Sequence, residues 1–211
     1  MKIYITRHSK TIWNKEKRLQ GRKDSPLTQE GIENALALKK FISNMSFDLV
    51  YSSPIQRALH TAQLLFDHQN IILDDRLMEM NFGDFEGRKI LDILETDCEL
   101  YHNLWKHPER FDRIAHGESY DEVIARAQSF KENLMKIDVK NVFIVTHGMF
   151  FIVFIATLLG LKKEDFVKLN EQIVEGCSLT CIDYQDGEFK VEYYNSCDFL
   201  PHRSHNDFTK G

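Results

Sequence analysis

The sequence predicts an α/β fold in which a mostly parallel central sheet lies between layers of helices. Two observations predict it. Short apolar runs typical of strands alternate along the chain with segments whose apolar residues recur at helical spacing. Near the C-terminus, residues 178–184 and 188–194 alternate apolar and polar side chains around an Asp-Gly pair, a pattern typical of a β-hairpin. We therefore expect one domain over residues 1–211, with a hairpin at its end.

The composition is that of an ordinary globular protein. Apolar residues make up 43% of the 211 residues and charged residues 28%, and the net charge is −5. A net negative charge does not attract nucleic acid or an acidic membrane surface. The four cysteines lack metal-ligand spacing, and no signal-peptide pattern precedes the first strand. We expect a cytoplasmic protein with reduced thiols that binds neither nucleic acid nor a membrane.

One apolar segment, residues 142–161, is about as long as a membrane-spanning helix. It contains a polar break, Thr146-His147-Gly148, after its first quarter. Before the break the residues are typical of a strand, and after it they are typical of a helix. We therefore expect a buried strand, a turn and a buried helix rather than a membrane span.

The first elements in chain order form a strand–helix–strand unit. Residues 3–6 are β-branched and apolar, which favours a strand, and residues 11–23 are polar and basic, which indicates a loop or short helix. Thr28 is a plausible N-cap for the next helix. The second strand is expected at residues 47–51, parallel to the first. The helix between them is expected to bury Ile32, Ala35, Leu36, Leu38, Phe41 and Ile42.

The next helix is expected to begin at a Ser-Pro pair. Ser53 suits an N-cap and Pro54 suits the first helical position. Arg57 then lies in the first turn, where its side chain can reach back over the carboxyl end of the sheet. Residues 71–73 form a short candidate strand.

The middle of the chain is expected to be less regular. Residues 79–87 form a glycine-punctuated loop in which Glu86 can act as a stabiliser, and residues 88–118 form a partly helical lid insertion. Ser119 and Glu122 have the spacing of a capping box, which predicts a helix from there to about Met135. The polar tail, residues 202–211, is expected to be frayed.

Cationic and titratable side chains follow three of the expected strands. Arg7 and His8 end the first, Arg57 follows the second, and His147 follows the strand near residue 145. Ligands bind beyond the carboxyl ends of parallel strands, and both arginine and helix N-termini bind phosphate well. The pattern predicts a phosphoryl-binding site, with carboxylate or sulfate as alternatives. A metal site fits less well, because neighbouring arginines would repel the cation.

Further short motifs occur in a fixed order from residue 3 to about residue 160. They are Arg7-His8-Ser9-Lys10-Thr11, Trp13-Asn14, Gln20-Gly21, Asp24-Ser25-Pro26-Leu27-Thr28, Ser53 with Arg57-Ala58 and Thr61-Ala62, Glu79 with Phe82-Gly83 and Glu86-Gly87, Gly117-Glu118-Ser119, and Thr146-His147-Gly148. In this order they resemble the histidine phosphatase superfamily, the phosphoglycerate mutase-like proteins. The resemblance implies the phosphoglycerate mutase-like sheet sandwiched by helices.

The resemblance also implies a covalent mechanism. His8 would be the nucleophile, forming a phosphohistidine through its neutral imidazole. Arg7, Arg57 and His147 would hold the phosphoryl oxygens and neutralise their charge. Glu79 would give a proton to the leaving oxygen and then act as the base for water.

The remaining implications concern ligands. Asn14, Gln20 and Gly21 would contact the phosphate or the substrate, a small phosphorylated metabolite. No metal or other cofactor is required. The sequence predicts neither the particular substrate nor the oligomeric state.

Two departures from the family pattern bear on the activity. Ser9 stands where the family usually has glycine, so we expect it either to narrow the pocket or to add a hydroxyl to it. Residues 88–118 lack the paired arginines of the cofactor-dependent mutases. This favours a phosphatase, with a phosphoglycerate mutase and a non-catalytic phospholigand-binding protein as alternatives. A further set of basic residues could favour a second anionic group on the substrate: Arg18, Arg22, Lys23 and Arg88.

Overall fold

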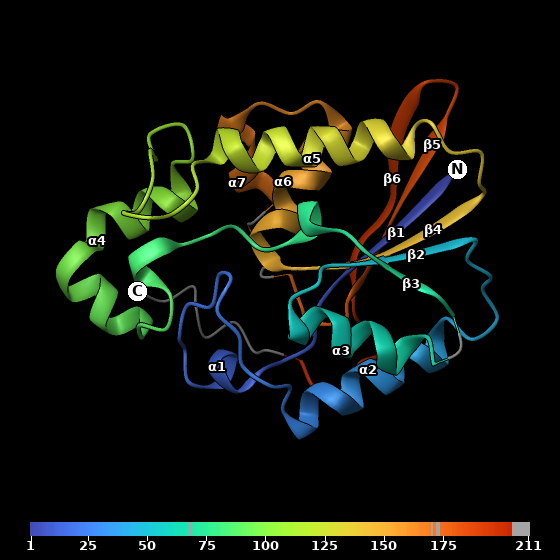
Figure 1. The fold of residues 1–211 in the computed structure, drawn as a ribbon, viewed down its shortest axis with the longest axis horizontal. Coiled ribbons are helices and arrows are strands. Elements are labelled where there is room, and N and C mark those ends of the chain that lie inside the picture. Colours follow the sequence, from blue (N-terminus) through green and yellow to red (C-terminus); the bar gives the residue numbers. More distant parts are fainter. Residues whose placement is uncertain (68, 170, 172–173, 204–211) are drawn as a thin grey trace.

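The computed structural model describes residues 1–67, 69–169, 171 and 174–203, and its centre is a six-stranded sheet (Figure 1). The strand order is β3-β2-β4-β1-β5-β6. Strands β1 to β4 are parallel, whereas β5 pairs antiparallel with β1 and β6 antiparallel with β5. The α/β fold with a mostly parallel sheet is thus confirmed. The strands are β1 (Lys2–Arg7), β2 (Leu49–Ser52), β3 (Ile71–Leu73), β4 (Asn141–Thr146), β5 (Leu179–Gln185) and β6 (Glu188–Ser196).

Helices cover both faces of the sheet. The α-helices are α1 (Ile12–Lys15), α2 (Gln29–Phe41), α3 (Gln56–Leu65), α4 (Ile90–Lys106), α5 (Tyr120–Leu134), α6 (Gly148–Leu159) and α7 (Phe166–Leu169). Three short 3₁₀ helices are η1 (Asp75–Leu77), η2 (Gly83–Phe85) and η3 (Lys163–Asp165). Figure 1 shows α2 and α3 on one side of the sheet, α5 to α7 on the other, and α4 beyond its edge.

Side chains of β4 alternate between two apolar clusters. Val142 and Ile144 belong to the cluster that contains α5 and α6, whereas Phe143 and Val145 belong to the cluster with α2 and α3. The alternation follows from the two-residue period of a strand. Because both faces are covered, β4 is apolar along most of its length.

Helix α2 buries a narrower stripe than the sequence predicts. Ala35, Leu38 and Ile42 are buried, but Leu36 is 47% exposed and Phe41 is 45% exposed. Residues spaced three and seven apart share one face of a helix, and Leu36 and Phe41 lie outside that face. The prediction was therefore wrong for these two residues. Phe41 instead stacks on Phe199, with ring centroids 4.3 Å apart.

Helix starts were predicted correctly at two positions and incorrectly at one. The Thr28 side chain caps α2 by accepting from the Gly31 N–H, and Ser119 and Glu122 form the expected capping box of α5. The prediction for α3 was wrong, because its N-cap is Ile55 and the helix begins at Gln56. The hydroxyl of Ser53 contacts another part of the chain instead, as described below. Arg57 does lie in the first turn of α3.

The apolar segment 142–161 folds as strand β4, then His147, then the buried helix α6. Within the described part of the chain, no helix is long and apolar enough to cross a membrane. The hairpin β5–β6 turns at Asp186 and Gly187, which have φ of 54° and 85°. Positive φ at both central residues is the geometry that an Asp-Gly turn favours.

Most of the predicted polar tail, residues 204–211, lies outside the described residues. Its first residue, His202, is not frayed. The His202 N–H donates to Asn34 Oδ1 at 3.1 Å, and the Asn34 amide donates to the His202 carbonyl at 2.7 Å. The chain is therefore held against α2 at least as far as His202.

The carboxyl ends of β1, β2 and β4 meet at one edge of the sheet. Arg7 pairs with Thr146 and Ser52 with Val145 in the strand register. The ladder continues one residue further, because the N–H of His8 donates to the Thr146 carbonyl and that of Ser53 to the Val145 carbonyl. His8, Ser53 and His147 are consequently brought side by side.

Candidate active site

His8 lies directly after β1, with only 3% of its surface exposed. Its Nδ1 is 2.7 Å from the Ser9 carbonyl oxygen. A carbonyl can only accept, so Nδ1 carries the ring proton and Nε2 carries the lone pair. Burial and the charges of Arg57 and Arg7 lower the pKa of His8 well below its ordinary value. The site therefore presents a neutral imidazole with a lone pair on Nε2.

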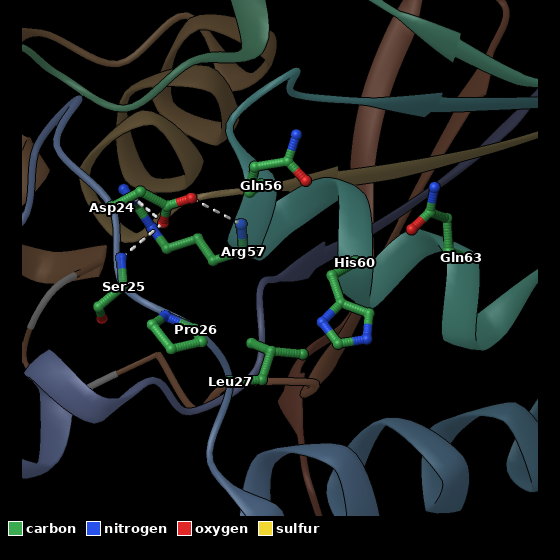
Figure 2. Close-up of a pocket in the computed structure, with 8 residues that line it drawn as sticks. All are labelled: Asp24, Ser25, Pro26, Leu27, Gln56, Arg57, His60 and Gln63. Carbon is green, nitrogen blue, oxygen red and sulfur yellow. Dashed lines mark hydrogen bonds and ion pairs between the residues drawn. The ribbon is translucent and has the colours of Figure 1, made fainter.

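Arg57 points its guanidinium at this lone pair. Its Nε–H donates to His8 Nε2 at 3.1 Å, and only 2% of the residue is exposed. Nη2 donates to the Gly21 carbonyl, and Nη1 donates to the Lys23 carbonyl and to Asp24. Figure 2 shows the carboxylate of Asp24 bonded to both the guanidinium and the backbone N–H of Arg57. The loop before α2 thus fixes the direction of Arg57.

His147 lies across the site from His8. The two ring centroids are 5.2 Å apart, and His147 is fully buried as the N-cap residue of α6. Its Nε2 is 2.7 Å from Ser53 Oγ. Burial, followed by the charge of Arg57, lowers the pKa of His147 well below its ordinary value.

Two buried nitrogen atoms at this edge have no hydrogen-bond partner among the described residues. They are His147 Nδ1 and Arg7 Nε. Arg7 is held through Nη1, which donates to the Val174 carbonyl at 2.8 Å. Buried polar atoms without a protein partner are rare, and a bound ligand group or an ordered water commonly satisfies them. An anion that accepts from both atoms would satisfy them.

Glu79 lies at the N-terminus of α6, with 7% of its surface exposed. Its carboxylate accepts from the N–H groups of Met80, Met149 and Phe150 at 2.9 to 3.1 Å. A Cβ atom added to Gly148 would lie 3.5 Å from Arg7 Nε and 3.8 Å from Glu79 Oε2. Glu79 and Arg7 therefore border the same residue at the start of α6.

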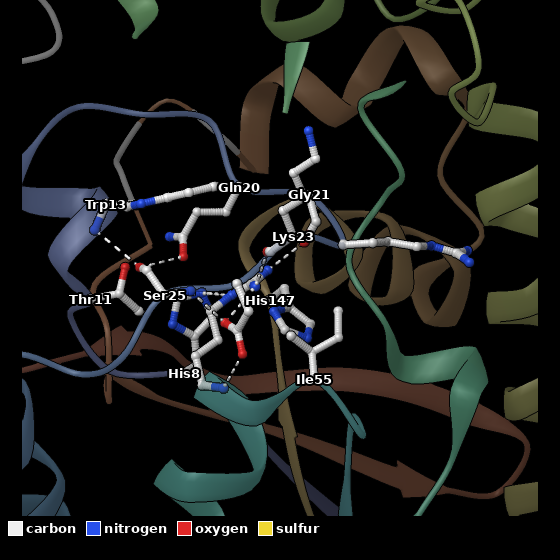
Figure 3. A network of polar contacts seen from close by, with 12 residues as sticks. His8, Thr11, Trp13, Gln20, Gly21, Lys23, Ser25, Ile55 and His147 are labelled. Atoms are coloured by element: carbon white, nitrogen blue, oxygen red, sulfur yellow. Dashed lines mark hydrogen bonds and ion pairs between the residues drawn. The ribbon is translucent and has the colours of Figure 1, made fainter. Parts of the chain in front are cut away.

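Each of the three residues expected to bind substrate, Asn14, Gln20 and Gly21, contacts a different group of the protein. Gly21 contacts Arg57 through its carbonyl, and Gln20 is buried with its Oε1 accepting from Ser25 Oγ. The Asn14 Oδ1 accepts from the Thr11 backbone and hydroxyl in the capping box of α1. Figure 3 shows the loop that carries Gln20, Gly21 and Lys23 next to His8 and His147. Contact of any of the three with substrate stays a prediction.

The hydroxyl of Ser9 is not added to the pocket, so this one of the two alternatives expected for Ser9 was wrong, whereas narrowing of the pocket by Ser9 stays a prediction. It donates to the Gly31 carbonyl of α2 at 2.6 Å, and Ser9 is fully buried. Gly31 lacks a side chain, and a Cβ atom there would be 2.3 Å from the Lys10 carbonyl oxygen. Glycine at position 31 lets this loop approach α2 closely enough for the Ser9 hydroxyl to reach its carbonyl.

The basic side chains that could bind a second anionic group all contact protein groups. Arg22 pairs with Glu118, and Lys23 donates to the Glu86 carbonyl. Arg18 pairs with Glu16 and Arg88 with Asp97. Their engagement does not favour a second anionic group on the ligand.

Three residues that the sequence reasoning did not assign to the site prove to support it. Asp24 orients Arg57, and Ser53 contacts His147. The carboxylate of Glu86 accepts from three backbone N–H groups, which confirms that it stabilises its loop. Ser53 belongs to the same motif as Arg57, which could have indicated a role at the site. Because serine is also a good N-cap, the sequence favoured helix capping instead.

A cavity of about 410 Å³ adjoins Arg57 (Figure 2). Its lining comes from residues 24–27 and from side chains of α3, including Gln56, His60 and Gln63. His8 and His147 are not among the residues that line it. Across the described ranges, no group of three or more His, Cys, Asp or Glu side chains could hold a metal ion.

The chain is similar to known proteins in both sequence and fold. The family model described as "Histidine phosphatase superfamily (branch 1)" matches residues 3–197. A protein of Yersinia pestis (strain Pestoides F) named "Probable phosphoglycerate mutase GpmB" is 31% identical over 189 residues, covering 88% of this chain and 86% of the relative.

Two solved structures share the fold closely. Bacillus stearothermophilus YhfR superposes with a TM-score of 0.86 at 29% identity, covering 94% of this chain and 98% of that one. The alpha-ribazole phosphatase from Shigella flexneri superposes with a TM-score of 0.82, also at 29% identity, covering 93% and 96%. The similarity therefore extends over nearly the whole of each chain.

Proposed function

Because this chain belongs to the histidine phosphatase superfamily (branch 1), we propose that it is a phosphatase that hydrolyses small phosphate monoesters through a phosphohistidine on His8. The observation that carries the proposal is the state of His8. Its Nδ1–H donates to the Ser9 carbonyl, and its Nε2 lone pair faces Arg57 within a buried group of nitrogen donors. A neutral imidazole oriented in this way is a nucleophile beside an anion site.

In the first step, the Nε2 lone pair of His8 attacks phosphorus, and the bond from phosphorus to the leaving oxygen breaks. Glu79, as the carboxylic acid, transfers its proton to that oxygen, so the product leaves as an alcohol. Arg57 Nε–H donates to the same lone pair in this structure, and in the proposed step it donates instead to a phosphoryl oxygen of the bound ester. The Ser9 carbonyl stabilises the positive charge that develops on the ring.

In the second step, water attacks the phosphohistidine and gives a proton to the carboxylate of Glu79. The bond between phosphorus and Nε2 breaks, which releases inorganic phosphate and returns His8 to its neutral form. Arg7, Arg57 and His147 donate to the three non-bridging oxygens in both steps. These charges and donors come from the chain itself, so neither step needs a metal ion.

Phosphoglycerate mutase activity is the second candidate, and the name of the Yersinia relative favours it. The name of the Shigella neighbour favours a phosphatase. The engagement of the basic side chains around the site supports the phosphatase, because a mutase must also grip the carboxylate of its substrate. A phospholigand-binding protein without activity is the remaining alternative. We further propose a cytoplasmic location, supported by the four free cysteines.

An aryl phosphate assay with His8→Ala tests the nucleophile. We expect the wild type to release phosphate and to accumulate an acid-labile, base-stable phosphoprotein when quenched during turnover. His8→Ala should lose both signals. Hydrolysis by His8→Ala at the wild-type rate would remove His8 from the mechanism, and binding of phosphate without turnover by the wild type would favour the binding protein.

A series of aryl phosphates of increasing leaving-group pKa tests the role of Glu79. Glu79→Gln cannot donate the proton, so we expect it to slow esters with poor leaving groups more than esters with good ones. An equal reduction across the series would show that Glu79 is not the acid.

A further inference from the structure

The carboxylate of Glu86 joins the loop that carries Glu79 to the loop that orients Arg57. It is buried, with 8% of its surface exposed. Oε1 accepts from the N–H of Arg22 at 2.8 Å and of Phe82 at 3.0 Å, and Oε2 accepts from the N–H of Lys23 at 2.9 Å. One carboxylate thus connects the loop that follows Glu79 to the loop that precedes α2.

The loop held by Glu86 is the loop that orients Arg57. The carbonyl oxygens of Gly21 and Lys23 accept from Arg57 Nη2 at 2.6 Å and Nη1 at 2.8 Å. The N–H groups that Glu86 binds, those of Arg22 and Lys23, belong to the same short stretch of backbone. The Arg22 N–H and the Gly21 carbonyl belong to one planar peptide unit, so Glu86 fixes that carbonyl directly. The Lys23 carbonyl belongs to a different peptide unit and is held indirectly, through the backbone of Lys23 whose N–H Glu86 binds.

Gly21 shows how closely the two loops approach. Its φ is +58°, and a Cβ atom there would lie 2.0 Å from Glu86 Oε1. Only glycine combines this backbone conformation with room for the carboxylate. The glycine that the family motif places at position 21 therefore matches the position of Glu86.

We propose that Glu86 is a positioning residue for Arg57. By holding the backbone of residues 21–23, it aims the guanidinium at His8 Nε2 and at the phosphoryl group that binds there. The chain of contacts runs from Glu86 to the loop N–H groups, from the loop carbonyls to Arg57, and from Arg57 Nε to His8. The catalytic consequence rests on the proposed function, but the orientation of Arg57 does not.

Glu86→Gln tests the orientation directly. Both carboxylate oxygens accept N–H groups, whereas an amide offers one acceptor and turns its NH₂ toward a remaining donor. In the ¹⁵N-labelled protein without ligand, we expect a slowly exchanging Arg57 Nε–H resonance, assigned by its loss in Arg57→Lys. In Glu86→Gln it should shift and exchange rapidly with water.

Activity gives the second readout. We expect Glu86→Gln to lower kcat/KM for an aryl phosphate about 100-fold, the effect of misplacing a catalytic group by about 1 Å. In an Arg57→Ala background the same change should cost less than about threefold, because there is no guanidinium left to orient. If Glu86→Gln does not fold, Glu86→Asp replaces it, since it keeps the charge but is one methylene shorter.

Asp48→Asn is the matched control. Asp48 also accepts two backbone N–H groups, those of Lys140 and Asn141, but at the amino end of β4. It should leave the Arg57 resonance and the activity unchanged. An unchanged Arg57 resonance in Glu86→Gln would overturn the proposal, as would a 100-fold loss that persists without Arg57. A wild type that hydrolyses no phosphate ester would overturn the proposed function, while the resonance would still test the orientation.

Discussion

The hydroxyl of Ser53 determines which nitrogen of the His147 ring can donate a hydrogen bond to a ligand. Ser53 Oγ accepts from the Ile55 N–H at 3.3 Å and lies 2.7 Å from His147 Nε2. When the hydroxyl donates its own proton to Nε2, the neutral ring carries its proton on Nδ1. Nδ1 is the buried atom that lacks a partner among the described residues, so it becomes a donor for a phosphoryl oxygen. Ser53 therefore orients His147 and selects its tautomer.

Ser53→Ala should lower kcat/KM about fivefold, because the loss of one hydrogen bond of about 1 kcal/mol frees the ring and its tautomer. Steady-state kinetics with an aryl phosphate measures the effect. Ser52→Ala is the matched control, since the Ser52 hydroxyl donates to the Ser53 carbonyl and not to the ring. Equal activity of the Ser53 and Ser52 variants would show that the hydroxyl does not act through His147.

Two buried histidines should make the protein sensitive to mild acid. Burial is the first cause that lowers the pKa of both His8 and His147 below their ordinary value of 6.5. Below pH 6.5 the unfolded chain takes up protons that the folded chain does not. The free energy of unfolding should therefore be highest above pH 6.5 and fall as the pH drops below it, by at most about 1.4 kcal/mol per pH unit for each ring.

Urea unfolding between pH 5 and 8, in buffers without phosphate, measures this dependence. His8→Gln removes one of the two titrating rings, so the free energy of unfolding should depend less steeply on pH below pH 6.5. Any change that the substitution makes to the free energy of unfolding above pH 6.5 does not affect this slope. If the wild type and the variant had parallel pH profiles, His8 would not be the source of the slope.

At the scale of elements, Ser9 connects the end of β1 to α2. Its hydroxyl donates to the Gly31 carbonyl, and its N–H donates to Thr61 Oγ1 of α3. Ser9→Gly would restore the residue usual in the family and remove the first of these bonds. We expect it to destabilise the protein by about 1–2 kcal/mol, from the lost hydrogen bond and the added backbone freedom of glycine.

Urea unfolding at pH 7 measures that loss, and the aryl phosphate assay provides the comparison. Because the Ser9 side chain is directed at α2, Ser9→Gly should change kcat/KM by less than about threefold. A large gain in activity with unchanged stability would instead support the alternative expected from the sequence, that Ser9 narrows the pocket.

Elements whose signals are local could be predicted from the sequence. The capping box at Ser119 and the turn at Asp186-Gly187 depend on residues three apart or fewer, and both occur as predicted. The start of α3 could not be predicted, because Ser53 contacts His147, which is 94 positions away in the chain. Local capping propensity is a weak guide when a tertiary partner takes the hydroxyl.

The same distinction applies to the site. The meeting of His8, Arg57 and His147 could be predicted, because parallel strands end at a common edge. Two of the groups that orient Arg57 could not be predicted, since they are the backbone carbonyls of Gly21 and Lys23, whereas the third is the side chain of Asp24. Every residue has a backbone carbonyl, so a role that depends on the carbonyl cannot be predicted from the identity of the side chain.

At the scale of the whole molecule, the distribution of charge favours a phosphatase over a mutase. The chain has a net charge of −5 but places two arginines, the buried Arg57 and the partly buried Arg7, at one edge of its sheet. The basic side chains around that edge are engaged with protein groups, as Arg22 is with Glu118 and Arg88 with Asp97. This edge thus has cationic donors suited to one phosphoryl group. Arg22 and Arg88 are already paired with carboxylates of the protein, which does not favour their binding a carboxylate of the same substrate.

With 3-phosphoglycerate and catalytic bisphosphoglycerate, we therefore expect phosphate release to exceed formation of the 2-isomer by at least about tenfold, which corresponds to about 1.4 kcal/mol. A coupled enolase assay measures the isomer, and a molybdate assay measures phosphate in the same samples. Glu118→Gln releases Arg22 from its ion pair, so it should improve KM for phosphoglycerate relative to a phosphate ester with a neutral leaving group. Isomer formation faster than phosphate release in the wild type would instead show that the site retains its phosphohistidine from water, as a mutase must.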